Sequence, residues 1–156
     1  MITIQSKVFS IDHVLNKIRA DKTQIGAIVT FVGYVRDFGE DNEKKLIAME
    51  VEHYPGMTEK VLQDIESKAK KRWKLSATEI IHRVGRLDLS EPIVCVAVAS
   101  KHRDDAFEAA RYIMDFLKTE APFWKKEITS IGNYWVTDKY SDHIQKSSWN
   151  DDIEKI

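Results

Sequence analysis

The chain has 156 residues, 43% hydrophobic and 31% charged, which suits one soluble domain with a substantial buried core. Its formal net charge of -1 excludes a protein that coats nucleic acid through a general basic excess, so any basic patch has to be local. No apolar run approaches the ~20 residues that a membrane-spanning helix requires.

The first third of the chain predicts strands around one helix. Residues 2–9 alternate loosely and predict a short strand, and Ser10 is the expected N-cap of a helix over residues 11–18. Residues 25–36 are rich in β-branched and aromatic side chains, which favours a strand. Gly26 and Gly33 within it indicate a bulge or a close approach of another backbone.

The middle and end of the chain predict a sheet with two more helices. Residues 45–53 alternate as a strand with one solvated face, and we expect Thr58 to cap the next helix. Strands follow at 77–84 and 91–100, the second apolar on both faces and therefore central in its sheet. Asp104 is the expected cap of a third helix, whose inward stripe is Phe107, Ala110, Ile113, Met114 and Leu117.

A short strand or two near 127–137 and a charged tail complete the prediction. The order βαββαββαβ with short connections predicts one α+β domain over residues 1–138, mostly antiparallel, followed by a polar tail over 139–156. The tail is expected either to fold over an empty pocket or to be a frayed terminus.

The segment MDFLKTEAPFWKKE, residues 114–127, is the first place to expect chemistry. Lys118 lies where an amphipathic helix should end, and the Ala121-Pro122 break should turn the chain. The turn brings Lys118 near Lys125 and Lys126 on the far side of an aromatic corner. Such a corner suits a small, flat, anionic ligand.

A wider basic set extends this hypothesis: Arg36, His102, Arg103, Lys118, Lys125 and Lys126. His102 and Arg103 lie where a strand meets a helix, and helix N-termini favour anions. The alternative is that these are ordinary solvated charges, as most Lys and Arg are. An electrostatic or general-acid role for Lys118 requires no lowered pKa, whereas a nucleophilic role does.

Other chemistries find little support in the residues. Cys95 lies inside an apolar run and is expected to be buried and structural. A single cysteine cannot form an internal disulfide, and the N-terminal segment does not resemble a secretory signal, so a cytoplasmic location is expected. The five histidines show no metal-ligand spacing, so no metal site is expected. Glycine-rich phosphate loops are also missing from the sequence.

Several segments together resemble the large, catalytic subunit of molybdopterin synthase, the MoaE family. They are TFVGYVRD (30–37), EHYPGMTEK (52–60), IHRVGRL (81–87), ASKHRDDAFEAARYIMDFLKTEAPFWKKE (99–127) and YWV (134–136). The resemblance runs in register from about Gly26 to Val136, and EHYPGM together with LKTEAPFWK makes it specific.

The resemblance implies a defined activity. It implies sulfur transfer to cyclic pyranopterin monophosphate, forming the dithiolene of molybdopterin in molybdenum cofactor biosynthesis. The sulfur donor would be the C-terminal Gly-Gly thiocarboxylate of a small, ubiquitin-like MoaD-like subunit, so no metal or redox cofactor is required. The implied fold is an α/β hammerhead with an additional antiparallel sheet. The implied assembly is a heterotetramer around a central dimer of large subunits.

The resemblance also assigns site residues. Lys118 and Lys125 match the two catalytic lysines of the family. The matching substrate-binding positions are Tyr34, Val35, Arg36, His102, Arg103, Lys126 and Glu127, with Tyr34 standing where some relatives have a lysine. Lys139 is expected to extend toward the pocket of a neighbouring subunit.

Two other functions are alternatives to sulfur transfer. The chain could be a docking module that binds a ubiquitin-like protein without catalysis, although the presence of both Lys118 and Lys125 argues against it. It could instead be an enzyme acting on another phosphorylated heterocycle, which Tyr34 alone favours.

Overall fold

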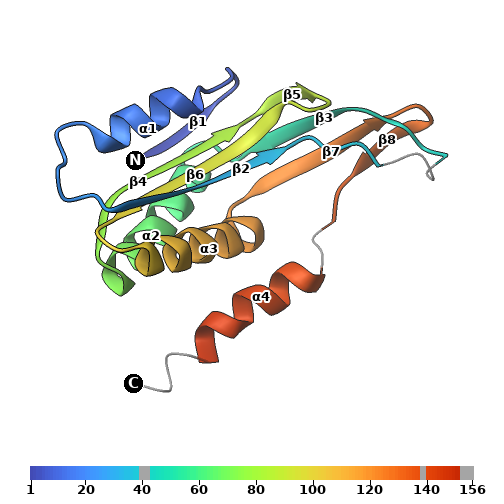
Figure 1. Cartoon of the computed structure of the whole chain (residues 1–156). Coiled ribbons are helices and arrows are strands. Elements are labelled where there is room, and N and C mark those ends of the chain that lie inside the picture. Colours follow the sequence, from blue (N-terminus) through green and yellow to red (C-terminus); the bar gives the residue numbers. More distant parts are fainter. Residues whose placement is uncertain (39–42, 138–139, 152–156) are drawn as a thin grey trace.

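The computed structural model of the chain describes residues 1–38, 43–137 and 140–151. Two four-stranded sheets and four helices make up the described part (Figure 1). The elements are β1 (Ile2–Gln5), α1 (Ile11–Arg19), β2 (Ala27–Tyr34), β3 (Leu46–His53), α2 (Met57–Arg72), β4 (Leu75–Arg83), β5 (Gly85–Asp88), β6 (Pro92–Ser100), α3 (Arg103–Glu120), β7 (Phe123–Thr129), β8 (Gly132–Trp135) and α4 (Tyr140–Asp151). None of these helices is long and apolar enough to cross a membrane.

The first sheet has the strand order β1-β4-β6-β2 and is covered on both faces. Strand β6, the apolar segment, lies between β4 and β2 and is antiparallel to both, which confirms its predicted central place. Helix α1 covers one face, and α2 and α3 cover the other (Figure 1). The α+β prediction is therefore confirmed, with β1 adding one parallel pair beside β4.

The second sheet has the order β5-β3-β7-β8 and is antiparallel throughout. Strand β7 enters it directly after α3, so the sheet joins the layer of helices at the end of α3 (Figure 1). Phe123, the first residue of β7, packs against both the large core under α2 and α3 and the smaller core of the second sheet. This residue marks the junction of the two cores.

Of the three predicted helix caps, Ser10 is confirmed, since its hydroxyl accepts from the His13 N–H, and the other two were wrong by two residues. Helix α2 begins after Gly56, whose N–H donates to Glu59 Oε2 over 2.6 Å. Thr58 lies inside the first turn, and its hydroxyl accepts from the Tyr54 N–H and donates to the Pro122 carbonyl over 3.1 Å. Thr58 therefore connects the start of α2 to the turn before β7.

Helix α3 begins after His102 rather than Asp104. Of its predicted inward stripe, Ala110, Ile113, Met114 and Leu117 are buried. Phe107, predicted to face inward, is 59% exposed, whereas Tyr112 and Phe116 are buried. Both misassigned residues lie in the first turn of their helices, where the helix dipole favours the acidic Asp104.

Gly26, just before β2, and Gly33, within it, lie at a close approach and at a bulge, as predicted. A Cβ at Gly26 would lie 2.2 Å from the carbonyl oxygen of Lys101, so only glycine lets this loop pass the start of α3. The β2–β6 register shifts between Gly33 and Tyr34, where a bulge redirects the chain toward Arg36.

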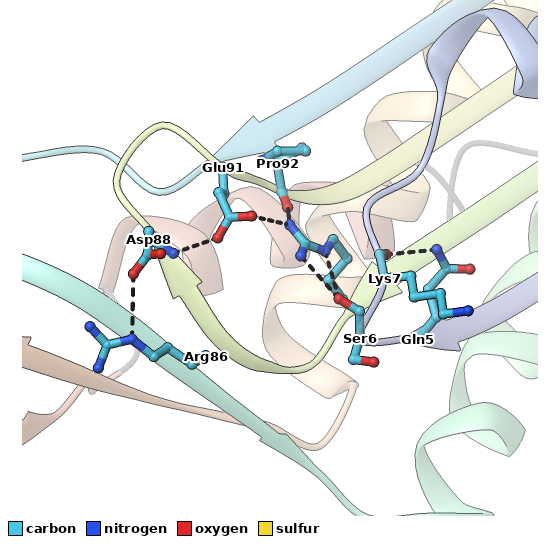
Figure 2. A network of polar contacts seen from close by, with 8 residues as sticks. Gln5, Ser6, Lys7, Arg86, Asp88, Glu91 and Pro92 are labelled. Atoms are coloured by element: carbon cyan, nitrogen blue, oxygen red, sulfur yellow. Dashed lines mark hydrogen bonds and ion pairs between the residues drawn. The ribbon is translucent and has the colours of Figure 1, made fainter.

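Arg83, at the end of β4, is the centre of a polar network that ties three segments together. Figure 2 shows this network with its partners Ser6, Glu91 and Pro92 labelled. The Arg83 side chain is 6% exposed and donates to the carbonyls of Ser6 and Pro92 and to Glu91 Oε1. Glu91 Oε2 also accepts the Asp88 N–H over 2.6 Å. The network joins the chain after β1 to the turn between β5 and β6.

The charged tail contains helix α4, which packs on the outer side of α3 (Figure 1). Trp149 is 7% exposed, and its indole N–H donates to Asp115 Oδ2 over 2.8 Å. The guanidinium of Arg72 lies 5.3 Å from the Trp149 ring. The predicted boundary at 138/139 lies outside the described residues and stays a prediction, and the helical tail was not predicted from its polar sequence.

Trp149→Phe should lower the free energy of unfolding by about 1–3 kcal/mol, because it leaves the buried Asp115 carboxylate without its indole donor. Chemical denaturation of both proteins measures this difference. Ser148→Ala is the matched control, since Ser148 is exposed on the same helix and bonds only locally to the Gln145 carbonyl. Equal stability of Trp149→Phe and the wild type would show that the bond does not anchor α4.

Candidate active site

The turn between α3 and β7 brings two lysines to one cavity. Helix α3 ends at Glu120, and Pro122 separates it from β7. Lys118 lies in the last turn of the helix, and Lys125 is the third residue of the strand. Side chains alternate along a strand, so Phe123, Lys125 and Glu127 line the cavity while the residues between them face away.

The cavity has a volume of about 560 Å³ and combines cations with apolar walls. Its positive groups are Arg36, Lys118 and Lys125. Its acceptors include Glu127 and Thr137. Its apolar wall is formed by Phe31, Leu46, Met49, Ile93, Val94, Met114, Leu117, Phe123 and Val136, and Tyr34 stands at its exposed side. Such a site can hold a flat ring against its walls and a phosphate against its cations.

Glu127 contributes a negative charge to the cavity and forms an ion pair with Lys44. Its Oε2 lies 3.8 Å from the ammonium of Lys44, which also lies over the ring of Tyr134. The carboxylate is therefore the counter-charge within a cation-lined cavity and an acceptor for N–H groups of a ligand.

His82 is a cavity residue that the sequence analysis did not assign. It is 1% exposed, and burial lowers its pKa to about 3, with smaller contributions from the charges of Lys125 and His53. The imidazole is thus neutral at physiological pH. The only sequence signal was its position at the end of a strand beside Arg83, which by itself does not distinguish it from a core residue.

His102 and Arg103 do not line this cavity. They lie at the opposite end of α3, in an open depression of about 410 Å³ lined by Gly26, Ala27, Lys101, His102, Arg103 and Asp104. His102 and Lys118 are sixteen positions apart along α3, which corresponds to about 24 Å at the usual rise. Within one chain His102 and Arg103 are therefore separated from Arg36, Lys118 and Lys125.

Val35 and Lys126 were also expected in the pocket, and the structure places both elsewhere. Val35 is 1% exposed and packs in the core of the second sheet. Lys126 points to the opposite face of β7 from Lys125, where it pairs with Glu50 Oε2 at 3.5 Å and lies over the ring of Trp135. Adjacent strand residues face opposite sides, so the two lysines cannot share one wall.

Two further expectations concern Cys95 and Lys139. Cys95 is buried in β6, and burial raises the pKa of its thiol to about 11, so it is the structural cysteine that was predicted. Lys139 lies outside the described residues.

The sequence of the chain matches a known protein family and its curated members. The family model described as "MoaE protein" matches residues 4–120 of the chain. A curated molybdopterin synthase catalytic subunit of Pseudomonas aeruginosa is 49% identical over 150 residues, which cover 96% of this chain and 99% of that protein. The protein of the same name from Escherichia coli strain K12 is 46% identical over 130 residues, 83% of this chain and 85% of that one.

Solved structures show the same fold. The molybdopterin biosynthesis MoaE protein of Burkholderia ambifaria MC40-6 superposes with a TM-score of 0.79 at 45% identity, covering 96% of this chain and 97% of that chain. A molybdopterin synthase structure from Staphylococcus aureus gives a TM-score of 0.79 at 32% identity, covering 86% and 96%. The predicted fold is thereby confirmed, and with these matches over most of its length the chain belongs to the MoaE family.

Proposed function

We propose that this chain is the catalytic subunit of a molybdopterin synthase and transfers sulfur to cyclic pyranopterin monophosphate in molybdenum cofactor biosynthesis. One observation carries the proposal: Lys118 and Lys125 meet Arg36 in a single apolar-walled cavity, in a chain 49% identical to a protein of that name. A flat pterin ring suits the walls, and a cyclic phosphate suits the cations.

The residues have distinct tasks in this reaction. Two thiocarboxylates each deliver one sulfur. One sulfur attacks a substrate carbon and displaces an ester oxygen of the cyclic phosphate, the other replaces the oxygen of the adjacent carbon, which leaves as water, and water cleaves each acyl–sulfur bond to leave a carboxylate on the donor. Lys118 lies beside the terminal carbonyl of the donor, where it polarises that carbonyl and moves protons. Lys125 stabilises the phosphate or the developing oxyanion, and Arg36 offers a planar fork to the phosphate. Tyr34 and Glu127 contact the substrate from the rim and the wall.

The sulfur donor is a small ubiquitin-like subunit whose Gly-Gly tail enters the cavity. The relatives are named catalytic subunits, which fits a protein that acts with a second kind of subunit. A narrow tail of two glycines is compatible with a cavity of about 560 Å³ that also has to admit the pterin. The cytoplasm is the proposed location, in agreement with a buried, unpaired Cys95.

His102 and Arg103 complete the site from a second copy of the chain. About 24 Å separates them from Lys118 within one chain, yet they lie in an open depression and Arg103 is 83% exposed. A dimer that sets this depression against the Lys118 cavity of its partner would bring His102 and Arg103 to Arg36, Lys118 and Lys125. Two such chains with one small subunit each would form the heterotetramer.

Reconstitution tests the proposal directly. The chain is mixed with a thiocarboxylated small subunit and cyclic pyranopterin monophosphate, and the dithiolene product is quantified. Product formed in proportion to the thiocarboxylate consumed would support the assignment. A stable complex with the small subunit that forms no product would instead favour the non-catalytic docking module.

A further inference from the structure

The distance between Lys118 and Lys125 depends on how the chain turns between α3 and β7. Six residues, 119–124, separate Lys118 in the last turn of α3 from Lys125 in β7. Phe123 is the residue of this turn that packs into both cores. Its backbone N–H donates to the Ala121 carbonyl over 2.8 Å, and the Pro122 carbonyl accepts from Thr58. The position of the Phe123 ring therefore sets where β7 begins.

His82 holds that ring from the first sheet. The imidazole of His82 stacks on the Phe123 ring with centroids 3.7 Å apart and planes inclined by 14°. Its Nδ1 lies 2.8 Å from the Arg83 carbonyl, so Nδ1 carries the proton and donates. The bond prevents the imidazole from turning out of the stack, and Arg83 itself is anchored by its network to Ser6 and Pro92.

The surroundings keep this imidazole uncharged. Lys125 and His53 both lie close enough for their charges to disfavour its protonation. The same cavity is lined by Arg36, Lys118 and Glu127, which leaves an excess of positive charge around it. A neutral, flat ring packs on the face of Phe123 without the desolvation cost of a buried cation.

We propose that His82 is a positioning residue of the sulfur-transfer site, which by stacking on Phe123 sets the distance between Lys118 and Lys125. The inference rests on the proposed function of these two lysines. It predicts that the ring, rather than a proton from the imidazole, is what catalysis requires.

The test compares three variants in the reconstituted synthase. His82→Ala removes the stack and is expected to lower kcat roughly 100-fold, with a smaller change in KM, because misplaced catalytic groups lose rate rather than binding. His82→Phe keeps a flat ring and should retain kcat within about tenfold of the wild type. Val98→Ala is the control for lost stability, since Val98 is buried in the core of the first sheet, away from the cavity.

The outcomes separate positioning from folding. Wild-type kcat in His82→Ala would overturn the inference, and so would an equal loss of kcat in Val98→Ala at the same loss of stability. If His82→Ala does not fold, Phe123→Leu removes the same stack from the other side and should show the same loss of kcat.

A structural readout distinguishes failure of this inference from failure of the proposed function. If the wild type forms no product, the proposed function fails. Crystal structures of the wild type and His82→Ala then test the positioning role of His82 without an activity measurement. We expect Phe123 and Lys125 to shift by about 1 Å or more relative to Lys118, the scale of displacement that affects catalysis. An unmoved Phe123 would overturn it.

Discussion

Lys118→Ala is expected to abolish sulfur transfer while the fold and the complex with the small subunit persist. Lys118 is an exposed residue of the last turn of α3, and its ammonium is one of three cations among the described residues that line the cavity. Removing one group that stabilises developing negative charge costs about 100- to 1000-fold in kcat. Single-turnover product formation measures this loss, and circular dichroism confirms the fold.

Lys118→Arg separates the two roles that the sequence left open. Arginine keeps the positive charge but does not release a proton at physiological pH. Partial activity in this variant would show that charge is sufficient, whereas loss equal to Lys118→Ala would show that proton transfer is required.

The neighbouring lysines of β7 provide a matched control. Lys125→Ala should lose most activity, and Lys126→Ala should retain it, because Lys126 faces Glu50 and Trp135 on the opposite side of the strand. Substantial activity in both Lys118→Ala and Lys125→Ala would contradict the proposed mechanism.

Arg83→Met is expected to lower the free energy of unfolding by roughly 2–5 kcal/mol, because each buried acceptor left unpaired costs about 1–3 kcal/mol. The side chain of Arg83 is 6% exposed and donates to the Ser6 and Pro92 carbonyls, so a methionine of similar length leaves both without a donor (Figure 2). Urea denaturation of the two proteins measures the difference.

The control for Arg83 lies in the same network. Arg86 pairs with Asp88 at 3.4 Å, but both side chains are more than half exposed, so Arg86→Met should change stability by less than about 1 kcal/mol (Figure 2). An equal loss of unfolding free energy in the two variants would show that the contribution of Arg83 to stability does not depend on its burial.

The network also predicts a dependence on pH. The Asp88 N–H that donates to Glu91, together with nearby Arg83, lowers the pKa of Glu91 below its ordinary value of 4.5. A carboxyl with a lowered pKa in the folded state stabilises the fold above the unfolded pKa and loses that contribution as pH falls through the folded one. Stability should therefore decline below about pH 4.5, and the Glu91 contribution to this decline should be smaller in Arg83→Met.

Much of the fold followed from local patterns. The apolar run of β6 indicated a central strand, and the alternation of residues 45–53 matched β3 closely. The short strand β5 was missed because Gly85, with a φ of 85°, turns the chain immediately after β4 and leaves only four residues for the strand. Helix α4 was missed because its support comes from Arg72 and Asp115, which are distant in sequence.

The site was harder to predict than the fold, for geometric reasons. A proline break after an amphipathic helix was enough to bring Lys118 and Lys125 together, because both flank one turn. Treating Lys125 and Lys126 as one wall ignored the alternation of a strand that was expected to begin later than it does. The separation of His102 from Lys118 follows from the length of α3. This length could have been estimated from the helix that the sequence predicts.

The pairing of β3 with β7 has a consequence for how the protein folds. Phe123 pairs with His53, a contact between positions 70 residues apart (from 53 to 123), and the turn leading to Lys125 is held by Thr58 across a similar span. Contacts between such distant segments form slowly, because the intervening chain has to be ordered first. The catalytic cavity therefore forms late, after β7 has been synthesised and docked. Substitutions that delay this pairing should reduce the yield of active protein without changing the turnover of the molecules that fold.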